Sequence, residues 1–301
     1  MNPKKPRLER GSLLALLDEA VLVARSFFGR LYLGLALPPA LAAGLMAASQ
    51  GLMMPGMLSA TTAPGPEAML SMLRHFGLFF LFFFIYMALM ALSAAAIFAG
   101  AAASLQGRSI SALEAWRWAI RGRNLWTLTL MGVLTGLGAL FCLLPGIYLM
   151  IVWALTLPVM LWEDGAGFEA LERSRKLVGY GPDRPVFSPG MGWVLLVGVT
   201  VVVLNYGVSM AVQMPLTIVQ QLFMLRHVMG QEASQAAVNP MSVFPPWFFA
   251  LQALSTMLTT MVQMLVMFFS ASAFNLLYLR LRGRKEGGDL MEALNRLRAP
   301  E

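Results

Sequence analysis

Residues 77–103 read GLFFLFFFIYMALMALSAAAIFAGAAA, a run without a single charged side chain. A bilayer core about 30 Å thick is crossed by roughly 20 apolar residues in a helix, so this stretch predicts a membrane span. Five further stretches satisfy the same criterion, and the sequence predicts an all-α membrane protein with six transmembrane helices. The predicted spans lie at 31–50, 77–103, 125–143, 146–162, 192–213 and 248–279. Leu144-Pro145-Gly146 is predicted to form the tight turn between the third and fourth spans.

The composition excludes most other classes of protein. Of the 301 residues, 58% are hydrophobic and 12% are charged, whereas a soluble domain is about one quarter charged. The single cysteine, Cys142, excludes an intrachain disulfide and a thiolate metal cluster. The two histidines, His75 and His227, are far apart in the sequence. We therefore expect an integral membrane protein, a single polytopic domain over residues 1–301, with no cofactor and no metal.

The placement of Lys and Arg tests the predicted spans independently. All of the 22 basic residues except Arg74 and Arg226 fall on one side of the six-span arrangement. Basic residues concentrate in cytoplasmic segments, so both the N-terminal segment 1–30 and the tail 280–301 are predicted to be cytoplasmic. The net charge of +7 then favours anionic lipid headgroups as partners. Nucleic acid is not expected as a partner, because the chain carries no basic module interleaved with aromatic residues.

Two short segments on the predicted cytoplasmic side have helical amphipathic patterns. In 110–121, Leu113, Trp116 and Ile120 share one face, and in 167–178, Phe168, Leu171 and Val178 do so. The second segment also offers the pairs Glu169/Arg173 and Glu172/Lys176 at a spacing of four. Both are predicted to be interfacial helices.

An internal repeat is suggested by a shift of 58 residues, which aligns ALEAWR (112–117) with ALERSR (170–175). A fainter echo lies at 20–25, ahead of the first span. The hypothesis is a unit of one interfacial helix and a two-span hairpin, used three times. The alternative is that any amphipathic helix rich in Ala, Leu, Glu and Arg would match as well.

One segment carries a family resemblance. Leu144-Pro145-Gly146-Ile147-Tyr148-Leu149 is followed by Trp153, Pro158 and Glu163, and then by Glu169-Ala170-Leu171 and Ser174. With these residues, 144–178 resembles the membrane domain fused to some bacterial glycerophosphoryl diester phosphodiesterases, and also stand-alone six-span bacterial membrane proteins of poorly defined function. The resemblance implies a helical inner-membrane protein that acts beside lipid or envelope metabolism. It does not imply phosphodiesterase activity, because the catalytic domain has no counterpart in this chain.

Polar residues in the last two spans form the strongest candidate for a functional face. Gln252, Thr256, Thr259 and Gln263 follow one another at spacings of four, three and four, and Asn205 and Ser209 lie four apart in the fifth span. Such side chains are costly against lipid and should point inward. One interpretation is hydrogen bonding between helices, and the other is the lining of a path for a polar substrate or a headgroup.

Small residues indicate where helices can approach closely. Gly132 and Gly136 in the third span and Gly100 in the second are predicted to mediate packing, with self-association through either face left open. Residues 216–228, after Pro215, are expected to form an amphipathic helix on the outer surface.

The leading functional hypothesis is a non-enzymatic inner-membrane protein that assists lipid or envelope processes, with a protein partner or self-association left open. The alternative is a passive transporter or lipid-translocating protein that uses the polar face of the last span. An enzyme ranks third, because its site would have to lie around Glu163, Asp164 and Glu169. Those acids have Arg173, Arg175 and Lys176 nearby as partners.

Overall fold

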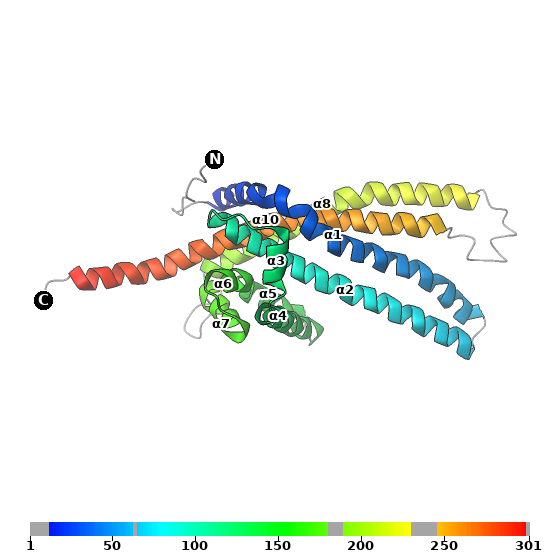
Figure 1. The fold of residues 1–301 in the computed structure, drawn as a ribbon, viewed down its shortest axis with the longest axis horizontal. Coiled ribbons are helices and arrows are strands. Elements are labelled where there is room, and N and C mark those ends of the chain that lie inside the picture. Colours follow the sequence, from blue (N-terminus) through cyan, green and yellow to red (C-terminus); the bar gives the residue numbers. More distant parts are fainter. Residues whose placement is uncertain (1–11, 63–64, 142, 180–188, 230–245, 299–301) are drawn as a thin grey trace. The chain divides into compact units, whose positions relative to one another are not determined.

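The computed structural model describes residues 12–62, 65–141, 143–179, 189–229 and 246–298, and within these ranges every regular element is a helix (Figure 1). The helices in chain order are α1 (Leu13–Thr62), α2 (Pro66–Leu105), α3 (Ala112–Ala119), α4 (Gly122–Phe141), α5 (Leu143–Val152), α6 (Thr156–Trp162), α7 (Gly167–Val178), α8 (Pro189–Met229) and α10 (Pro246–Arg298). The all-α prediction is confirmed.

Five stretches are long and apolar enough to cross a membrane: Leu13–Gly51, Met72–Leu105, Leu144–Trp162, Gly190–Arg226 and Trp247–Arg284. They correspond to the first, second, fourth, fifth and sixth predicted spans. The protein is therefore a multi-pass membrane protein. The third predicted span coincides with α4, which is a helix of 20 residues but does not meet the same criterion over its described residues.

Several predicted boundaries are corrected by the structure. α5 already begins at Leu143, so Leu144-Pro145-Gly146 forms the start of this helix and not the turn of the α4–α5 hairpin. Proline is tolerated there, because the first N–H groups of a helix have no intrahelical partner. Residues 216–228 belong to the continuous α8, so the separate surface helix predicted there is wrong. The tail continues as part of α10, whose 53 residues span about 80 Å.

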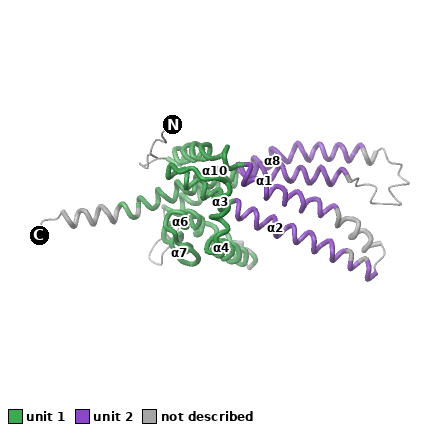
Figure 2. Tube along the Cα trace, in the orientation of Figure 1, with its two compact units in different colours: residues 1–32, 94–203, 266–301 green, residues 33–93, 204–265 purple. Residues whose placement is uncertain are grey.

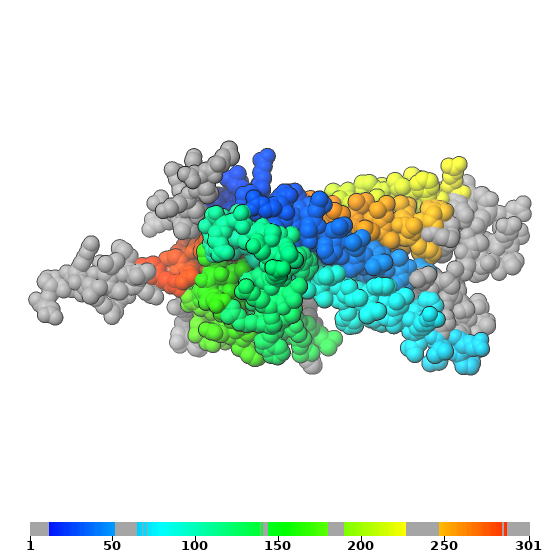
Figure 3. All heavy atoms as spheres, in the orientation of Figure 1, coloured from blue at the N-terminus to red at the C-terminus, as the bar shows by residue number. Residues whose placement is uncertain are grey.

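The chain divides into two compact units (Figure 2). Unit 1 comprises residues 1–32, 94–203 and 266–301, and it contains α3 to α7 together with parts of α1, α2, α8 and α10. Unit 2 comprises residues 33–93 and 204–265, and its described residues include the remaining parts of those four long helices. In the space-filling view, the green atoms of α4 to α7 form one side of unit 1 (Figure 3).

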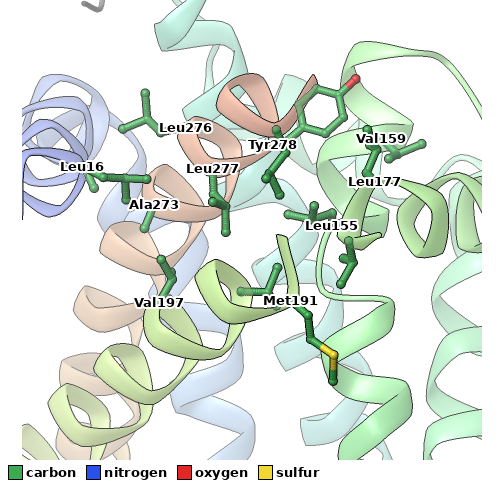
Figure 4. Packing of buried hydrophobic residues seen from close by; sticks show 14 of the residues in the cluster. Leu16, Leu155, Val159, Leu177, Met191, Val197, Ala273, Leu276, Leu277 and Tyr278 are labelled. Atoms are coloured by element: carbon green, nitrogen blue, oxygen red, sulfur yellow. The ribbon is translucent and has the colours of Figure 1, made fainter. Parts of the chain in front are cut away.

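The core of unit 1 collects apolar side chains from segments far apart in the sequence. Leu16 of α1, Leu155 before α6, Leu177 of α7, Val197 of α8 and Leu277 of α10 are all at most 1% exposed (Figure 4). Leu16 belongs to the segment predicted to be a basic cytoplasmic extension, so this segment also contributes to the fold.

Unit 2 is held in part by small residues of α1. A Cβ atom on Gly44 would lie 2.5 Å from Cγ of Met257, and one on Gly51 would lie 2.5 Å from the Phe249 ring. Both partners belong to α10, so α1 and α10 approach so closely that only hydrogen fits at these two positions.

Candidate functional site

A charged cluster surrounds Glu163, the residue that follows α6. Glu163 Oε2 accepts a hydrogen bond from Arg173 Nε at 2.7 Å, and Oε1 accepts one from the Tyr278 hydroxyl at 2.7 Å. Arg282 Nη1 donates to the same tyrosine oxygen at 3.2 Å. Glu286 accepts a bond from Arg282 Nε at 2.6 Å and is also paired with Arg173. We call these five residues the Glu163 cluster.

The charges in the Glu163 cluster balance, with two carboxylates facing two guanidinium groups. Hydrogen bonds from Arg282 and then from Arg173 hold the pKa of the Glu286 carboxyl below its ordinary value. The bond to Glu163 is the main reason why the pKa of Arg173 is raised. Because the Glu163 side chain is only 18% exposed, its hydrogen bonds are partly shielded from solvent. The cluster ties α6, α7 and α10 together within unit 1.

A break in the fourth predicted span places Ser174 in a structural role. α5 ends at Val152 and α6 starts at Thr156, and the Thr156 N–H bonds to the carbonyl of Trp153 and not to that of Val152. The Val152 carbonyl instead accepts a hydrogen bond from the buried Ser174 hydroxyl at 2.8 Å. Ser174, with the buried Ala170 and Leu171, thus docks α7 on the region of the break.

Two further polar contacts fix this region. The Thr127 hydroxyl of α4 donates to the Arg123 carbonyl and accepts a bond from the Gly167 N–H at 2.7 Å, where α7 begins. Asn275 of α10 is fully buried. Its carbonyl oxygen accepts from Trp162 Nε1 at 3.0 Å and its amide donates to the Ala271 carbonyl at 2.8 Å.

The two segments predicted to be interfacial do form short helices, and the apolar residues predicted to share a face in each differ in their burial. In α3 the buried residues are Ala115 and Ala119, while Leu113 and Ile120 are 60% and 51% exposed. In α7 Phe168 is 66% exposed and does not share the buried face of Leu171 and Val178. These exposed apolar side chains suit a helix that rests against lipid.

A hydrogen-bonded cap closes the N-terminus of α3. Ser111 and Glu114 form a reciprocal capping box, and the hydrogen bonds from Ser111 lower the pKa of the Glu114 carboxyl. The segment 20–25 lies within α1 and is not a separate helix.

The three acids considered for an enzyme site are not equivalent in the structure. Glu163 and Glu169 line one cleft of about 230 Å³, and Glu172, Arg173 and Lys176 contribute to the same lining. Asp164 is not part of this lining. It is largely exposed and paired with Arg123, which lowers the pKa of its carboxyl.

The predicted ion pairs along α7 are only partly found. Glu172 and Lys176 are paired at 2.8 Å, as expected from their spacing. Arg173 binds Glu163 and Glu286, whereas its predicted partner was Glu169. Within the described ranges, no group of three or more His, Cys, Asp or Glu side chains is arranged to hold a metal ion.

The polar face of the last span lies in unit 2, and hydrogen bonds within the protein engage part of it. Gln263 Nε2 of α10 is 3.2 Å from the Ser209 hydroxyl of α8, so these two residues are brought together. Thr256 donates to the Gln252 carbonyl of its own helix. Thr259 is buried, and its hydroxyl has no hydrogen-bond partner among the described residues. Asn205 is exposed and does not join this face.

The structure confirms one of the three glycines predicted to mediate close packing and not the other two. A Cβ atom on Gly100 would lie 2.6 Å from Cδ1 of Leu31, so close packing of α2 on α1 in unit 1 is confirmed there. At Gly132 and Gly136, a Cβ atom would meet no described atom within 4 Å, so the packing expected there within the chain is wrong. The close contact of α4 with α5 is made by Gly138, where a Cβ atom would lie 3.3 Å from Gly146 Cα.

Sequence reasoning missed Tyr278, Arg282 and Glu286 as members of the Glu163 cluster. Their spacing of four residues places them on one face of a helix, and this pattern could have signalled a shared partner. The partner itself lies more than 100 residues earlier in the chain, and no local pattern indicates it.

No family model, no curated protein sequence and no solved structure matches this chain.

Proposed function

We propose that this chain is a non-enzymatic, six-span protein of the bacterial inner membrane that assists lipid or envelope processes from its cytoplasmic face. The observation that carries the proposal is the combination of α7 and the Glu163 cluster. A short amphipathic helix follows a membrane span directly, and its inner face is packed and tied into unit 1. Its outer face, with Phe168 and basic residues, is exposed.

In this proposal α4, the third predicted span, completes the set of six. Its apolar side chains are open to the surroundings, with Val133 53% and Leu140 79% exposed, and it forms a hairpin with α5. Exposed apolar surface of this kind suits contact with acyl chains. The distribution of Lys and Arg supports cytoplasmic termini. The resemblance of residues 144–178 to the membrane domain of glycerophosphoryl diester phosphodiesterases, and to stand-alone six-span proteins, supports a role beside lipid metabolism.

An enzyme is disfavoured by the condition of the acids. Glu163 is held by Arg173 and Tyr278, and Asp164 is paired with Arg123. A general base must be within reach of a substrate proton, and carboxylate oxygens that already accept such bonds are poorly suited to that task. The Glu163 cluster is better explained as a clamp that holds α7 against α6 and α10.

Native mass spectrometry of the protein, purified gently from its own membrane, tests the proposal. We expect either a stoichiometric lipid or a second polypeptide, and either would also name the process that the protein assists. A bare monomer or dimer, reproducibly free of both, would contradict the assisting role.

The alternative is a passive transporter or lipid-translocating protein, with Gln252 and Gln263 in its path. The bond between Gln263 and Ser209 favours the packing interpretation of this face. Vesicle flux with both glutamines changed to leucine separates the two. A flux that is lost while the fold is retained favours a path, and a protein that shows no flux in either form excludes one.

A further inference from the structure

A groove of about 490 Å³ lies between α5 and α7 in unit 1. Tyr148 and Leu149 of α5, Trp153 of the following turn, and Phe168 and Leu171 of α7 give it apolar and aromatic walls. Its volume is within the range of about 300–1,000 Å³ typical of ligand sites. One wall belongs to the candidate span Leu144–Trp162, and the other belongs to the amphipathic helix that follows this span.

The charged lining of the groove favours an anion. Glu172 and Arg175 both line it, but the Glu172 carboxylate is bonded to Lys176 at 2.8 Å, which offsets its charge. Arg175 is exposed; its charge contributes to lowering the pKa of the Glu172 carboxyl, but among the described residues it forms no ion pair within 4 Å. A guanidinium group suits a phosphate, because its fork of N–H donors matches two phosphate oxygens.

We propose that this groove binds one anionic phospholipid, with its phosphate at Arg175 and an acyl chain along the aromatic and aliphatic walls. The inference rests on the proposed role in lipid processes and names a ligand and a site for it. Phe168, 66% exposed at the start of α7, would lie along the lipid chain and lose its contact with water. A soluble anion would use the arginine and leave these walls uncovered.

The chain supplies its own matched controls on α3. Arg117 aligns with Arg175 at the shift of 58 residues, and Leu113 is, like Phe168, an exposed apolar residue of a short amphipathic helix. Neither α3 residue lines the groove. Arg117→Gln removes the same charge as Arg175→Gln, and Leu113→Ala, like Phe168→Ala, removes exposed apolar surface, but both α3 changes leave the proposed site intact.

The test uses the full chain, delipidated in detergent and titrated with palmitoyl-oleoyl phosphatidylglycerol, with lipid adducts counted by native mass spectrometry. We expect Arg175→Gln to weaken the tightest binding about fivefold, the effect of one cation near an anionic lipid surface. Phe168→Ala should weaken it about threefold. Arg117→Gln and Leu113→Ala should stay within twofold of the wild type, and phosphatidylcholine should bind more weakly than phosphatidylglycerol.

The inference is overturned if both groove variants keep the wild-type affinity, or if Arg117→Gln weakens binding as much as Arg175→Gln. Equal binding of phosphatidylcholine, which has the same phosphate but no net charge, would also overturn it, because the groove would then not select an anionic lipid. A partner polypeptide would replace the lipid as the occupant of the groove if the thiol of Phe168→Cys were protected from a thiol reagent only when that polypeptide is present. If the groove variants bind lipid as the wild type does while the native protein still carries a stoichiometric lipid, the proposed lipid site is wrong. The proposed function would then still stand.

Discussion

Changing Glu163 to Gln removes the central charge of the Glu163 cluster while almost preserving its volume. The amide keeps one oxygen to accept from Arg173, and its NH2 group then faces the Tyr278 hydroxyl, whose oxygen already accepts a bond from Arg282. Hydrogen bonds to a charged group contribute about 1.5–3 kcal/mol each. Because the Arg173 side chain is 34% exposed and solvent screens part of its attraction, we expect a total loss of about 2 kcal/mol.

The assay is thermal unfolding of the purified protein in detergent, followed by intrinsic fluorescence of the tryptophans. A loss of about 2 kcal/mol corresponds to a fall in Tm of about 5 °C for a chain of this size. The matched control is Glu172→Gln, the same chemical change at an exposed ion pair one helix away, where we expect no resolvable shift. Tyr278→Phe, introduced into the wild type and into Glu163→Gln, completes a double-mutant cycle. The coupling energy between these two residues should be about 1 kcal/mol.

Either of two results would contradict this role of the Glu163 cluster. Equal Tm values for Glu163→Gln and Glu172→Gln would mean that the cluster adds nothing beyond a surface pair. Fully additive effects of Glu163→Gln and Tyr278→Phe would mean that the hydrogen bond between these residues does not contribute to stability.

Four further substitutions, in three tests, use the same thermal assay. Ser174→Ala should cost about 1–3 kcal/mol, because it leaves the carbonyl at the α5–α6 break buried without a partner, and an unchanged Tm would contradict this contact. Gly100→Ala should lower the Tm, because its Cβ would meet Leu31, whereas Gly132→Ala should leave it equal or slightly higher through helix propensity; the reverse order would be inconsistent with the packing. The lowered pKa of Glu286 means that its stabilising bonds are fully present above its ordinary value of 4.5 and are lost as the pH falls through the lower folded value. The difference in Tm between the wild type and Glu286→Gln should therefore shrink as the solution is acidified below pH 4.5, and a difference that stays constant down to full protonation of the carboxyl would argue against this role.

Much of the secondary structure could be predicted from local patterns. Long apolar runs identify the membrane helices, and amphipathic spacing identifies α3 and α7 near their observed bounds. Boundaries were less predictable where tertiary contacts replace local rules. Pro145 and Gly146 have the chemistry of a turn, yet Pro145 also suits the first turn of a helix, and α5 uses it there. Pro215 lies inside α8, although the pattern suggested a helix boundary after it.

The candidate site was less predictable than the fold. The acids Glu163 and Glu169 and the arginine Arg173 were singled out from the sequence, but the partners of Arg173 were assigned from its own helix. In the structure, Arg173 reaches Glu163 and Glu286, the second of which is more than 100 residues away. An ion pair at a spacing of four stabilises an exposed helix only slightly. An arginine therefore pairs instead with a carboxylate of another helix where that carboxylate is less exposed to water.

The long apolar runs are enough to make this protein helical and membrane-resident, because the cost of burying backbone polar groups in lipid leaves few alternatives. The sequence pattern also places the basic residues on one predicted side and the two short helices between spans. Which faces of these helices are buried, which glycine makes a close contact and which carboxylate binds the arginines depend on the packing of the folded chain. These contacts depend on distances between segments that are far apart in the chain. The periodicity of a helix shows which of its residues share a face, but not which residues of another helix lie opposite that face.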